Sequence, residues 1–373
     1  PDRKNAAYWN GNIPWVKTAQ IQNNVLTAAD IDEWITAEGL SESSARMIPR
    51  GTILMAMYGQ GKTRAQVAIL DIDAAINQAC AAILLKCGVD RDYVFQQLLY
   101  RYNSIRALSN TGSQENLNAD LIREIAFPLP PFDEQTRIAC LLTAWDTAIE
   151  TTERLIAAKE RFHRWLQQRL IEQRAARHHW ETQELGGLIR ERSERSIQHD
   201  EYPVLTSSRR GLFLQSEYFS KQVTSEDNTG YKIMRRGDFT FRSMSDDGRF
   251  VFNRLEKYDT GIISPAYGVF YAEGVSPEFL AHYLNSSYFA QLLARETQGG
   301  TRKALRFSAL AGMEVDLPKR TDQERIAAIL DNSRREIGLL QTRLEMLRRQ
   351  KRGLMQKLLT GEWRVPVREE ATA

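Results

Sequence analysis

Two stretches of the chain carry apolar residues at alternating intervals of four and three, the spacing of a helix that packs along another helix. In the stretch of residues 134–172 seven of ten such positions are apolar, and in the stretch 322–360 eight of ten are apolar. The first set is Ile138, Leu142, Trp145, Ile149, Thr152, Ile156, Lys159, His163, Leu166 and Leu170, and the second is Ile326, Leu330, Ser333, Ile337, Leu340, Leu344, Leu347, Lys351, Leu354 and Leu358. We therefore predict two long helices, each with an apolar seam that needs a partner.

Proline and glycine mark where these helices begin and end. The prolines Pro130 and Pro131 precede the first helix, Pro318 precedes the second, and Gly361 follows the second. Proline cannot continue inside a helix, and glycine often ends one. The simplest arrangement packs the two similar seams on each other, and the alternative docks each helix on its own globular half. About 35 helical residues at 1.5 Å each would span roughly 50 Å, enough for a spacer between two domains.

The chain also repeats itself at an offset of 186 to 188 residues. Residues 130–139 align with residues 318–327, and Val16 further upstream aligns with Val204. The identities in the helix-entry segment are Pro130, Gln135, Arg137, Ile138 and Ala139. A repeat of this kind indicates two similar domains in tandem.

The residues outside the long helices mix short strands with short helices. The segments that predict buried strands are 53–57, 68–70, 81–85, 238–241 and 268–271. Helices are predicted at 93–102 and 277–293. The expected fold is therefore α+β, with two similar domains that are each followed by a long heptad helix. The predicted limits are 1–127 and 179–316 for the domains, 128–178 and 317–361 for the helical segments, and 362–373 for a tail.

Composition excludes a membrane protein but does not identify a partner. Apolar residues make up 42% of the chain and charged residues 26%, and no apolar run reaches the length of about 18 residues that a membrane span needs. The formal charge of +3 is too small to establish a polyanionic partner by itself. Three cysteines without metal-site spacing fit a reducing compartment. Residues 180–188 have no counterpart before Pro1, so we expect residues to be missing at the front.

Residues 56–63 fit a relaxed phosphate-loop pattern directly after a strand. A true phosphate loop opens a helix, whereas residues 64–70 continue as a β-like run, and the matching loop at 242–249 has lost the pattern. We therefore interpret residues 59–64 as a glycine-flexible tip whose polar side chains can contact phosphates and base edges. A plain solvent-exposed turn is the alternative interpretation.

A second loop is also repeated. Residues 297–303 align with residues 109–115, and Leu305 aligns with Leu117. Different side chains on a repeated framework are what two modules that read different bases would need, although neutral drift would look the same. No constellation of catalytic or metal-binding residues stands out. The candidate DNA contacts are Gln60, Lys62, Thr63, Arg64, Arg209, Arg210, Arg242, Ser243, Arg249, Thr301, Arg302 and Lys303.

With these features together, the sequence resembles the specificity subunit of a type I restriction-modification system, and the resemblance covers essentially the whole chain. The segments that carry it are 11–16 (GNIPWV), 51–56 (GTILMA), 77–80 (NQAC), 128–135 (PLPPFDEQ) and 351–361 (KRGLMQKLLTG). The acids Asp246 and Asp247 depart from the expected chemistry, because they oppose direct phosphate contact in the second half.

The resemblance implies two target-recognition domains separated by an antiparallel pair of helices, each domain reading one half of a split site in double-stranded DNA. It implies two adenine methyltransferase subunits as partners, with AdoMet bound by those subunits and neither cofactor nor metal bound by this chain. It also allows ATP-dependent restriction subunits to join, in a cytoplasmic phage-defence complex of a bacterium or archaeon. A coiled-coil scaffold or adaptor protein is the alternative function, and a P-loop NTPase explains only one motif.

Overall fold

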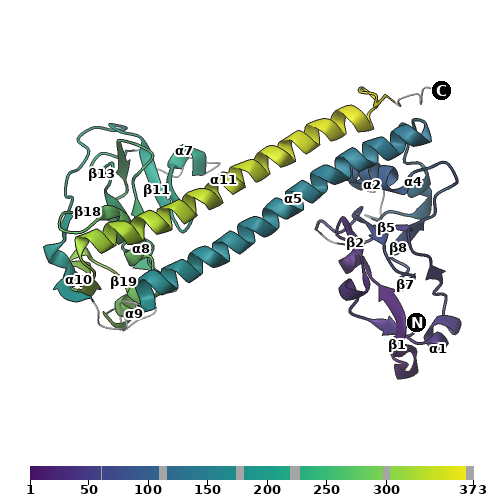
Figure 1. Ribbon diagram of the computed structural model, residues 1–373, viewed down its shortest axis with the longest axis horizontal. Coiled ribbons are helices and arrows are strands. Elements are labelled where there is room, and N and C mark those ends of the chain that lie inside the picture. The colour runs from purple at the N-terminus through teal and green to yellow at the C-terminus, as the bar shows by residue number, and fades with distance from the viewer. Residues whose placement is uncertain (60, 109–115, 174–179, 219–226, 297–302, 367–373) are drawn as a thin grey trace, which may run out of the picture. The chain divides into compact units, whose positions relative to one another are not determined.

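The protein is described by a computed structural model over residues 1–59, 61–108, 116–173, 180–218, 227–296 and 303–366. Its internal contacts divide it into two compact units, residues 1–153 with 343–373 and residues 154–342. Each unit contains one globular half together with part of both long helices (Figure 1). Among the helices in the described ranges, none has both the length and the apolarity that crossing a membrane requires.

The first globular half contains two four-stranded sheets and several short helices. One sheet has the order β3 (Trp34–Ile35), β1 (Trp9–Val16), β7 (Ala74–Ile76) and β4 (Met47–Ile48). The other has the order β2 (Asn24–Leu26), β6 (Val67–Leu70), β5 (Ile53–Ala56) and β8 (Cys80–Ile83). The α-helices are α1 (Ala37–Ser41), α2 (Arg91–Tyr100), α3 (Tyr102–Leu108) and α4 (Ala119–Arg123). This mixture confirms the predicted α+β class for the first half.

The second globular half also contains two four-stranded sheets. One has the order β12 (Gly211–Leu214), β11 (Val204–Ser208), β17 (Thr260–Ile263) and β13 (Lys232–Arg235), and the other has the order β10 (Ile189–Glu191), β18 (Tyr267–Ala272), β14 (Phe239–Arg242) and β16 (Asn253–Arg254). Two-stranded sheets pair β15 (Met244–Ser245) with β19 (Lys303–Ala304) and β20 (Glu314–Leu317) with β9 (Glu181–Glu184). The short helices are α7 (Gln215–Tyr218), α8 (Pro277–Leu284), α9 (Ser287–Glu296) and α10 (Phe307–Ala311).

The internal repeat predicted from the sequence extends to strand register. Val16 pairs with Ile76 where β1 runs parallel to β7, and Val204 pairs with Ile262 where β11 runs parallel to β17. In the other sheet, β5 lies between β6 and β8 just as β14 lies between β16 and β18. The sheets differ at one edge strand, because β2 pairs parallel with β6 in the first half whereas β10 pairs antiparallel with β18 in the second. The shared central strands confirm the tandem domains.

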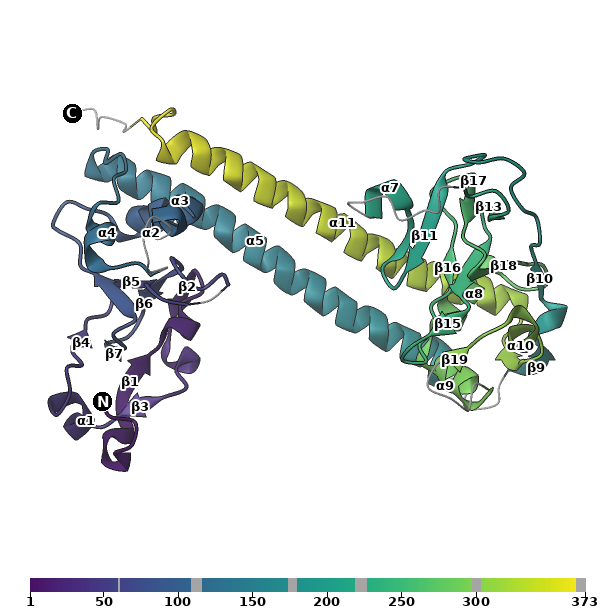
Figure 2. The same cartoon turned by 180° about the vertical axis from the view of Figure 1, so that it is seen from behind.

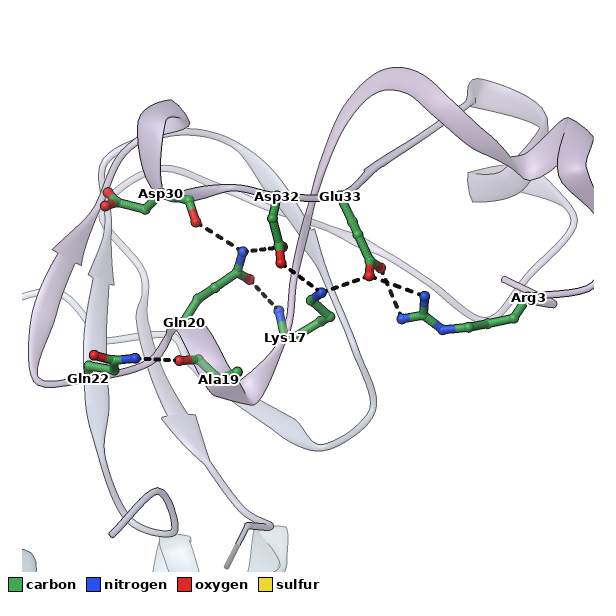
Figure 3. Close-up of polar contacts among 8 residues, drawn as sticks. All are labelled: Arg3, Lys17, Ala19, Gln20, Gln22, Asp30, Asp32 and Glu33. Atoms are coloured by element: carbon green, nitrogen blue, oxygen red, sulfur yellow. Dashed lines mark hydrogen bonds and ion pairs between the residues drawn. The ribbon is translucent and has the colours of Figure 1, made fainter. Parts of the chain in front are cut away.

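The first half contains a cluster of ion pairs around Lys17 and Glu33 (Figure 3). The ammonium of Lys17, at the end of β1, lies 2.7 Å from Glu33 and 3.0 Å from Asp32. Arg3 donates two hydrogen bonds to Glu33, at 2.9 and 3.2 Å, and Gln20 donates to Asp32 at 2.7 Å. The guanidinium of Arg3 lowers the pKa of Glu33, and its carboxylate in turn raises the pKa of Lys17. These cations therefore neutralise acids of the same domain.

The two long helices are α5 (Phe132–Gln167), which continues into a π-helical turn at Gln168–Glu172, and α11 (Arg320–Leu359). In the first unit, Ile138 and Leu142 of α5 share a buried cluster with Met355 and Leu358 of α11. The polar flank of this contact contains an ion pair of 2.7 Å between Arg348 and Glu153, and another between Lys351 and Asp146.

In the second unit, the end of α5 lies against the beginning of α11. Leu166 and Leu170 pack against the cluster that contains Ile326 and Leu330, and Lys159 lies 2.7 Å from Glu336. The helices are therefore antiparallel within each unit, as Figures 1 and 2 also show. This confirms the predicted pairing. The first turns of α11 also enter the core of the second half, so the alternative of docking on the globular half is partly realised as well.

One predicted helix is divided in the structure. Residues 277–293 form α8 and α9, which are separated at Asn285 and Ser286. The Asn285 amide donates to the carbonyl oxygens of Phe252 and Ala281 at 2.8 Å, and the Ser286 hydroxyl accepts the N–H of Phe289. Such side chains end one helix and begin another, so the apolar pattern continues while the backbone bends.

Candidate nucleic-acid interface

The loop between β5 and β6 forms the glycine-flexible tip of the first half. Gly59 and Gly61 have φ values of 140° and 62°, which glycine tolerates best. A Cβ atom at Gly59 would lie 2.7 Å from the Cβ atom of Thr63, too close for any other residue. The hydroxyl of Tyr102 donates to the carbonyl oxygen of Lys62 at 2.5 Å. The tip is thus fixed at its backbone while the Lys62 side chain is exposed.

The predicted DNA contacts of this tip differ in how exposed their side chains are. Lys62 is exposed and Thr63 is half-buried, whereas Arg64 is only 8% exposed. The next residue, Ala65, has a φ of 70°, and its N–H donates to the carbonyl oxygen of Ala56 at 2.9 Å. Arg64 is therefore less accessible than Lys62, and its contact with DNA stays a prediction. Gln60 lies outside the described residues.

A strand follows the tip, so the phosphate-loop interpretation fails on structural grounds. β6 begins at Val67, where a nucleotide-binding loop would open a helix. The N-terminus of such a helix supplies the backbone N–H groups that bind phosphate. The tip has no such helix, so its remaining chemistry is that of exposed polar side chains.

The corresponding loop of the second half lies between β14 and β16, where three predicted contacts share one hollow. Arg209, Arg242 and Arg249 line a hollow of about 320 Å³. Arg209 comes from the turn between β11 and β12, and it forms an ion pair with Asp247 of the loop. The two segments are 38 residues apart in sequence. Folding therefore gathers three guanidinium groups that the sequence placed on two separate segments.

Two further predicted contacts lie beside this hollow in different settings. Arg210 stacks over the ring of Tyr218, with 5.1 Å between the guanidinium carbon and the ring centroid. Ser243 contributes its backbone, since its N–H donates to the carbonyl oxygen of Ala266 at 3.0 Å and its carbonyl oxygen accepts from Leu305 at 2.8 Å. Its half-buried side chain is less available to DNA than the three arginines around the hollow.

Both halves join their two loops by the same backbone hydrogen bond. In the second half it runs from the N–H of Leu305 to Ser243, and in the first half it runs from the N–H of Leu117 to the carbonyl oxygen of Met57 at 3.0 Å. In the second half the pairing of β15 with β19 extends this contact and sets Lys303 opposite Ser245. The backbone of Lys303 is thus placed, whereas Thr301 and Arg302 lie outside the described residues.

The sequence did not identify every residue around the second hollow. Ser207 and Ser208 of β11 also line it, and Asp247 proves to be a partner of Arg209 rather than only a source of repulsion. A single sequence carries no signal for this contact, because tertiary contacts bring the two segments together, among them the hydrogen bonds that the Asn253 amide donates to Ser207 and Ser208 at 2.8 Å. The alternation of β11 could at most have indicated which serines face one side.

The chain is similar to proteins of one known family. The model of the family described as "Type I restriction modification DNA specificity domain" matches residues 2–160 and again residues 179–349. The specificity subunit of the type I restriction enzyme MjaIX from Methanocaldococcus jannaschii is 27% identical over 157 residues, which cover 41% of this chain and 36% of that protein. The chain thus matches about a third of that relative's length.

Other relatives match more of the chain. The MjaVIII specificity subunit of the same organism is 21% identical over 309 residues, covering 74% of this chain and 71% of that protein. The crystal structure of a type I restriction-modification S subunit from M. genitalium superimposes with a TM-score of 0.56 at 13% identity, covering 96% and 91% of the two chains. At this identity the likeness shows a shared fold.

Proposed function

Because the chain belongs to the family of type I restriction modification DNA specificity domains, two copies of which it carries, we propose that it is the DNA-reading subunit of a type I restriction-modification system. Each globular half reads one half of a split target in double-stranded DNA. The chain itself carries out no chemistry, and a partner subunit that binds AdoMet transfers the methyl group to adenine.

The observation that carries this proposal is the repeated pairing of two loops on one scaffold. Met57 with Leu117 and Ser243 with Leu305 make the same hydrogen bond, and exposed cations lie on the adjoining loops of both halves. Cations supply affinity for the DNA backbone, and variable side chains on a fixed framework supply base readout. Two such surfaces in one chain are suited to a target in two parts.

We further propose that two methyltransferase subunits bind this chain and that restriction subunits join the complex, in the cytoplasm of a bacterial or archaeal cell where the DNA is found. An exposed apolar face of α5 supports a protein partner. Leu155, Phe162 and Trp165 are 42%, 49% and 50% exposed, and the last two rings stack with their centroids 5.6 Å apart. Apolar rings on a helix surface are typical of a site that another protein covers.

Binding of duplex DNA by the full chain, with and without a methyltransferase partner, tests the proposal. A library of random duplexes should yield one bipartite sequence, with two defined segments separated by an undefined one. A scaffold protein would select no sequence, and a P-loop NTPase would hydrolyse ATP without a partner. Failure to retain any duplex in both conditions would refute the proposed function.

Exchange of one half tests the division of labour between the domains. Replacing residues 179–316 with those of another family member should change one defined segment of the selected sequence and leave the other unchanged. The repeated topology allows this exchange, because each half keeps its own sheets. A change in both segments would contradict independent reading by the two halves.

A further inference from the structure

The loop between β14 and β16 is built around the carboxylate of Asp247. Its Oδ1 atom accepts hydrogen bonds from the Ser245 hydroxyl at 3.0 Å and from the backbone N–H of Arg249 at 3.1 Å. Its Oδ2 atom accepts from a terminal nitrogen of Arg209. Donors from two separate segments therefore hold this acid in one position, and the acid in turn holds Arg209.

The pair remains open to a ligand although its members bind each other. The side chain of Arg209 is 62% exposed and that of Asp247 is 45% exposed. The hydrogen bond to Asp247 engages one nitrogen of the guanidinium, whereas an arginine carries five N–H donors. Hydrogen bonding and the charge of Arg209 lower the pKa of Asp247 to about 2, so the acid is ionised at neutral pH.

The hold of Asp247 on Arg209 matters because other positive charges surround this pair. Arg242 and Arg249 line the same hollow of about 320 Å³. A flexible arginine in such a basic hollow would bind the nearest phosphate of any DNA, which adds affinity without sequence information. A guanidinium held at one nitrogen by a fixed carboxylate has a restricted orientation and a reduced attraction for phosphate. Its remaining donors suit the two acceptors on a guanine edge.

We propose that Asp247 is a positioning residue for base recognition, which holds Arg209 for contact with a base edge and keeps it from the DNA backbone. This inference rests on the proposed function of DNA reading. Asp247 thereby lowers affinity for DNA of any sequence and raises selectivity at one base pair of the segment read by the second half. The acid that appeared unfavourable for DNA binding becomes part of the recognition device.

The substitution Asp247→Asn isolates the charge of this residue. Asparagine retains an oxygen that can accept from Ser245 and from the backbone of Arg249, but it loses the ionic hold on Arg209. A matched control is Asp259→Asn, because Asp259 forms an exposed ion pair of 2.8 Å with Arg236 in the same half and lines neither the hollow nor its rim. Both variants raise the net charge by one.

The full-length variants are titrated, over a series of salt concentrations, with a duplex of random sequence and with the duplex that the wild-type chain selects. Asp247→Asn should tighten binding to random duplex roughly fivefold at low salt and steepen the plot of log affinity against log salt by about one unit. Binding to the selected duplex should not tighten, and discrimination at one base pair of the second segment should fall. Asp259→Asn should match the wild type.

A double variant shows whether the effect passes through Arg209. Arg209→Gln should lose the same base-pair discrimination, and adding Asp247→Asn to it should change neither the random-duplex affinity nor the salt dependence further. The inference is overturned when Asp247→Asn behaves as Asp259→Asn does, or when it tightens the selected and the random duplex equally. A wild-type chain that binds no duplex refutes the proposed function and this inference together, whereas a binding wild type with an unaffected variant refutes the inference alone.

Discussion

The side-chain oxygen of Gln323 accepts the backbone N–H of Ser276 at 2.9 Å, which ties the first turn of α11 to the beginning of α8. The amide of Gln323 also donates to the carbonyl oxygen of Pro318 at 2.9 Å. The first half repeats this junction, where Gln135 accepts from Asp90 at 2.9 Å and donates to Pro130 at 2.8 Å. One buried amide in each half therefore joins a proline-entered long helix to its globular domain.

Replacing this amide should destabilise the junction. Gln323→Ala leaves the N–H of Ser276 buried without its acceptor, so we expect a loss of about 1–3 kcal/mol in the free energy of unfolding. Urea unfolding followed by circular dichroism measures the loss. Gln356→Ala, at an exposed position of the same helix, should stay within about 0.5 kcal/mol of the wild type. Equal effects of the two substitutions would count against the junction.

Truncating the seam of α11 should cost far more than truncating its outer face. Leu344 is 8% exposed and Leu339 is 66% exposed, so the two leucines form a matched pair on one helix. Leu344→Ala removes buried apolar contacts and should cost about 2–5 kcal/mol, whereas Leu339→Ala should cost less than about 0.5 kcal/mol. The melting temperatures of both variants, measured by thermal unfolding, test this difference. Similar melting temperatures would argue that the helices do not depend on each other.

The second unit should lose stability in weak acid because of the half-buried His163. Burial, assisted by the charge of Arg334, lowers the pKa of His163 from 6.5 to about 4. The neighbouring His282 is 1% exposed, and burial lowers its pKa as well. The unfolded chain therefore takes up protons below pH 6.5 that the folded chain accepts only near pH 4, so stability present above 6.5 is lost as pH falls through this window.

The substitution His163→Gln should flatten that dependence. Unfolding midpoints measured at several pH values between 6.5 and about 4 should fall less steeply in the variant than in the wild type. An identical slope in the wild type and the variant would remove His163 as the cause.

Removing the exposed cation of the first tip should weaken binding without changing selectivity. Lys62→Ala should reduce affinity for all duplexes by a similar factor and flatten the salt dependence by roughly one unit, if the ammonium contacts only phosphate. Lys4→Ala makes the same charge change at another exposed position of this half and should have a smaller effect. Titration of binding against salt with several single-base variants of the target tests both expectations.

Arg64 and Arg242 were both predicted from the sequence to contact DNA, but their side chains differ in burial. Arg64 is 8% exposed and Arg242 is exposed at the end of β14. Arg64→Ala should lower the melting temperature and weaken binding to all sequences in proportion, whereas Arg242→Ala should weaken binding at an unchanged melting temperature. Base-pair discrimination lost in a stable Arg64→Ala protein would instead indicate that Arg64 contacts a base.

The sequence predicted the long helices well because their signal is local. The predicted segments 134–172 and 322–360 differ by only a few residues from the helices observed, since heptad spacing and proline entry both lie within the segment itself. The pairing of similar halves also followed from the repeat. These features need no knowledge of distant contacts.

The details of the candidate site could not be predicted in the same way. Arg64 carries a charge that suggests exposure, but it is only 8% exposed in the fold. Asp247 suggests repulsion of DNA until its partner Arg209, 38 residues earlier, is known. Both outcomes depend on tertiary contacts, which a pattern of residue types along one chain does not encode.

The hydrogen bonds that join the two loops of each half run between backbone atoms, from Leu117 to Met57 and from Leu305 to Ser243. A connection made by backbone atoms does not depend on which side chains the loops carry. Mutation can therefore alter the residues at the loop tips without loosening the connection itself. If the chain reads DNA as proposed, new target sequences can arise by point substitutions in these loops, because the two backbone hydrogen bonds do not depend on the side chains there.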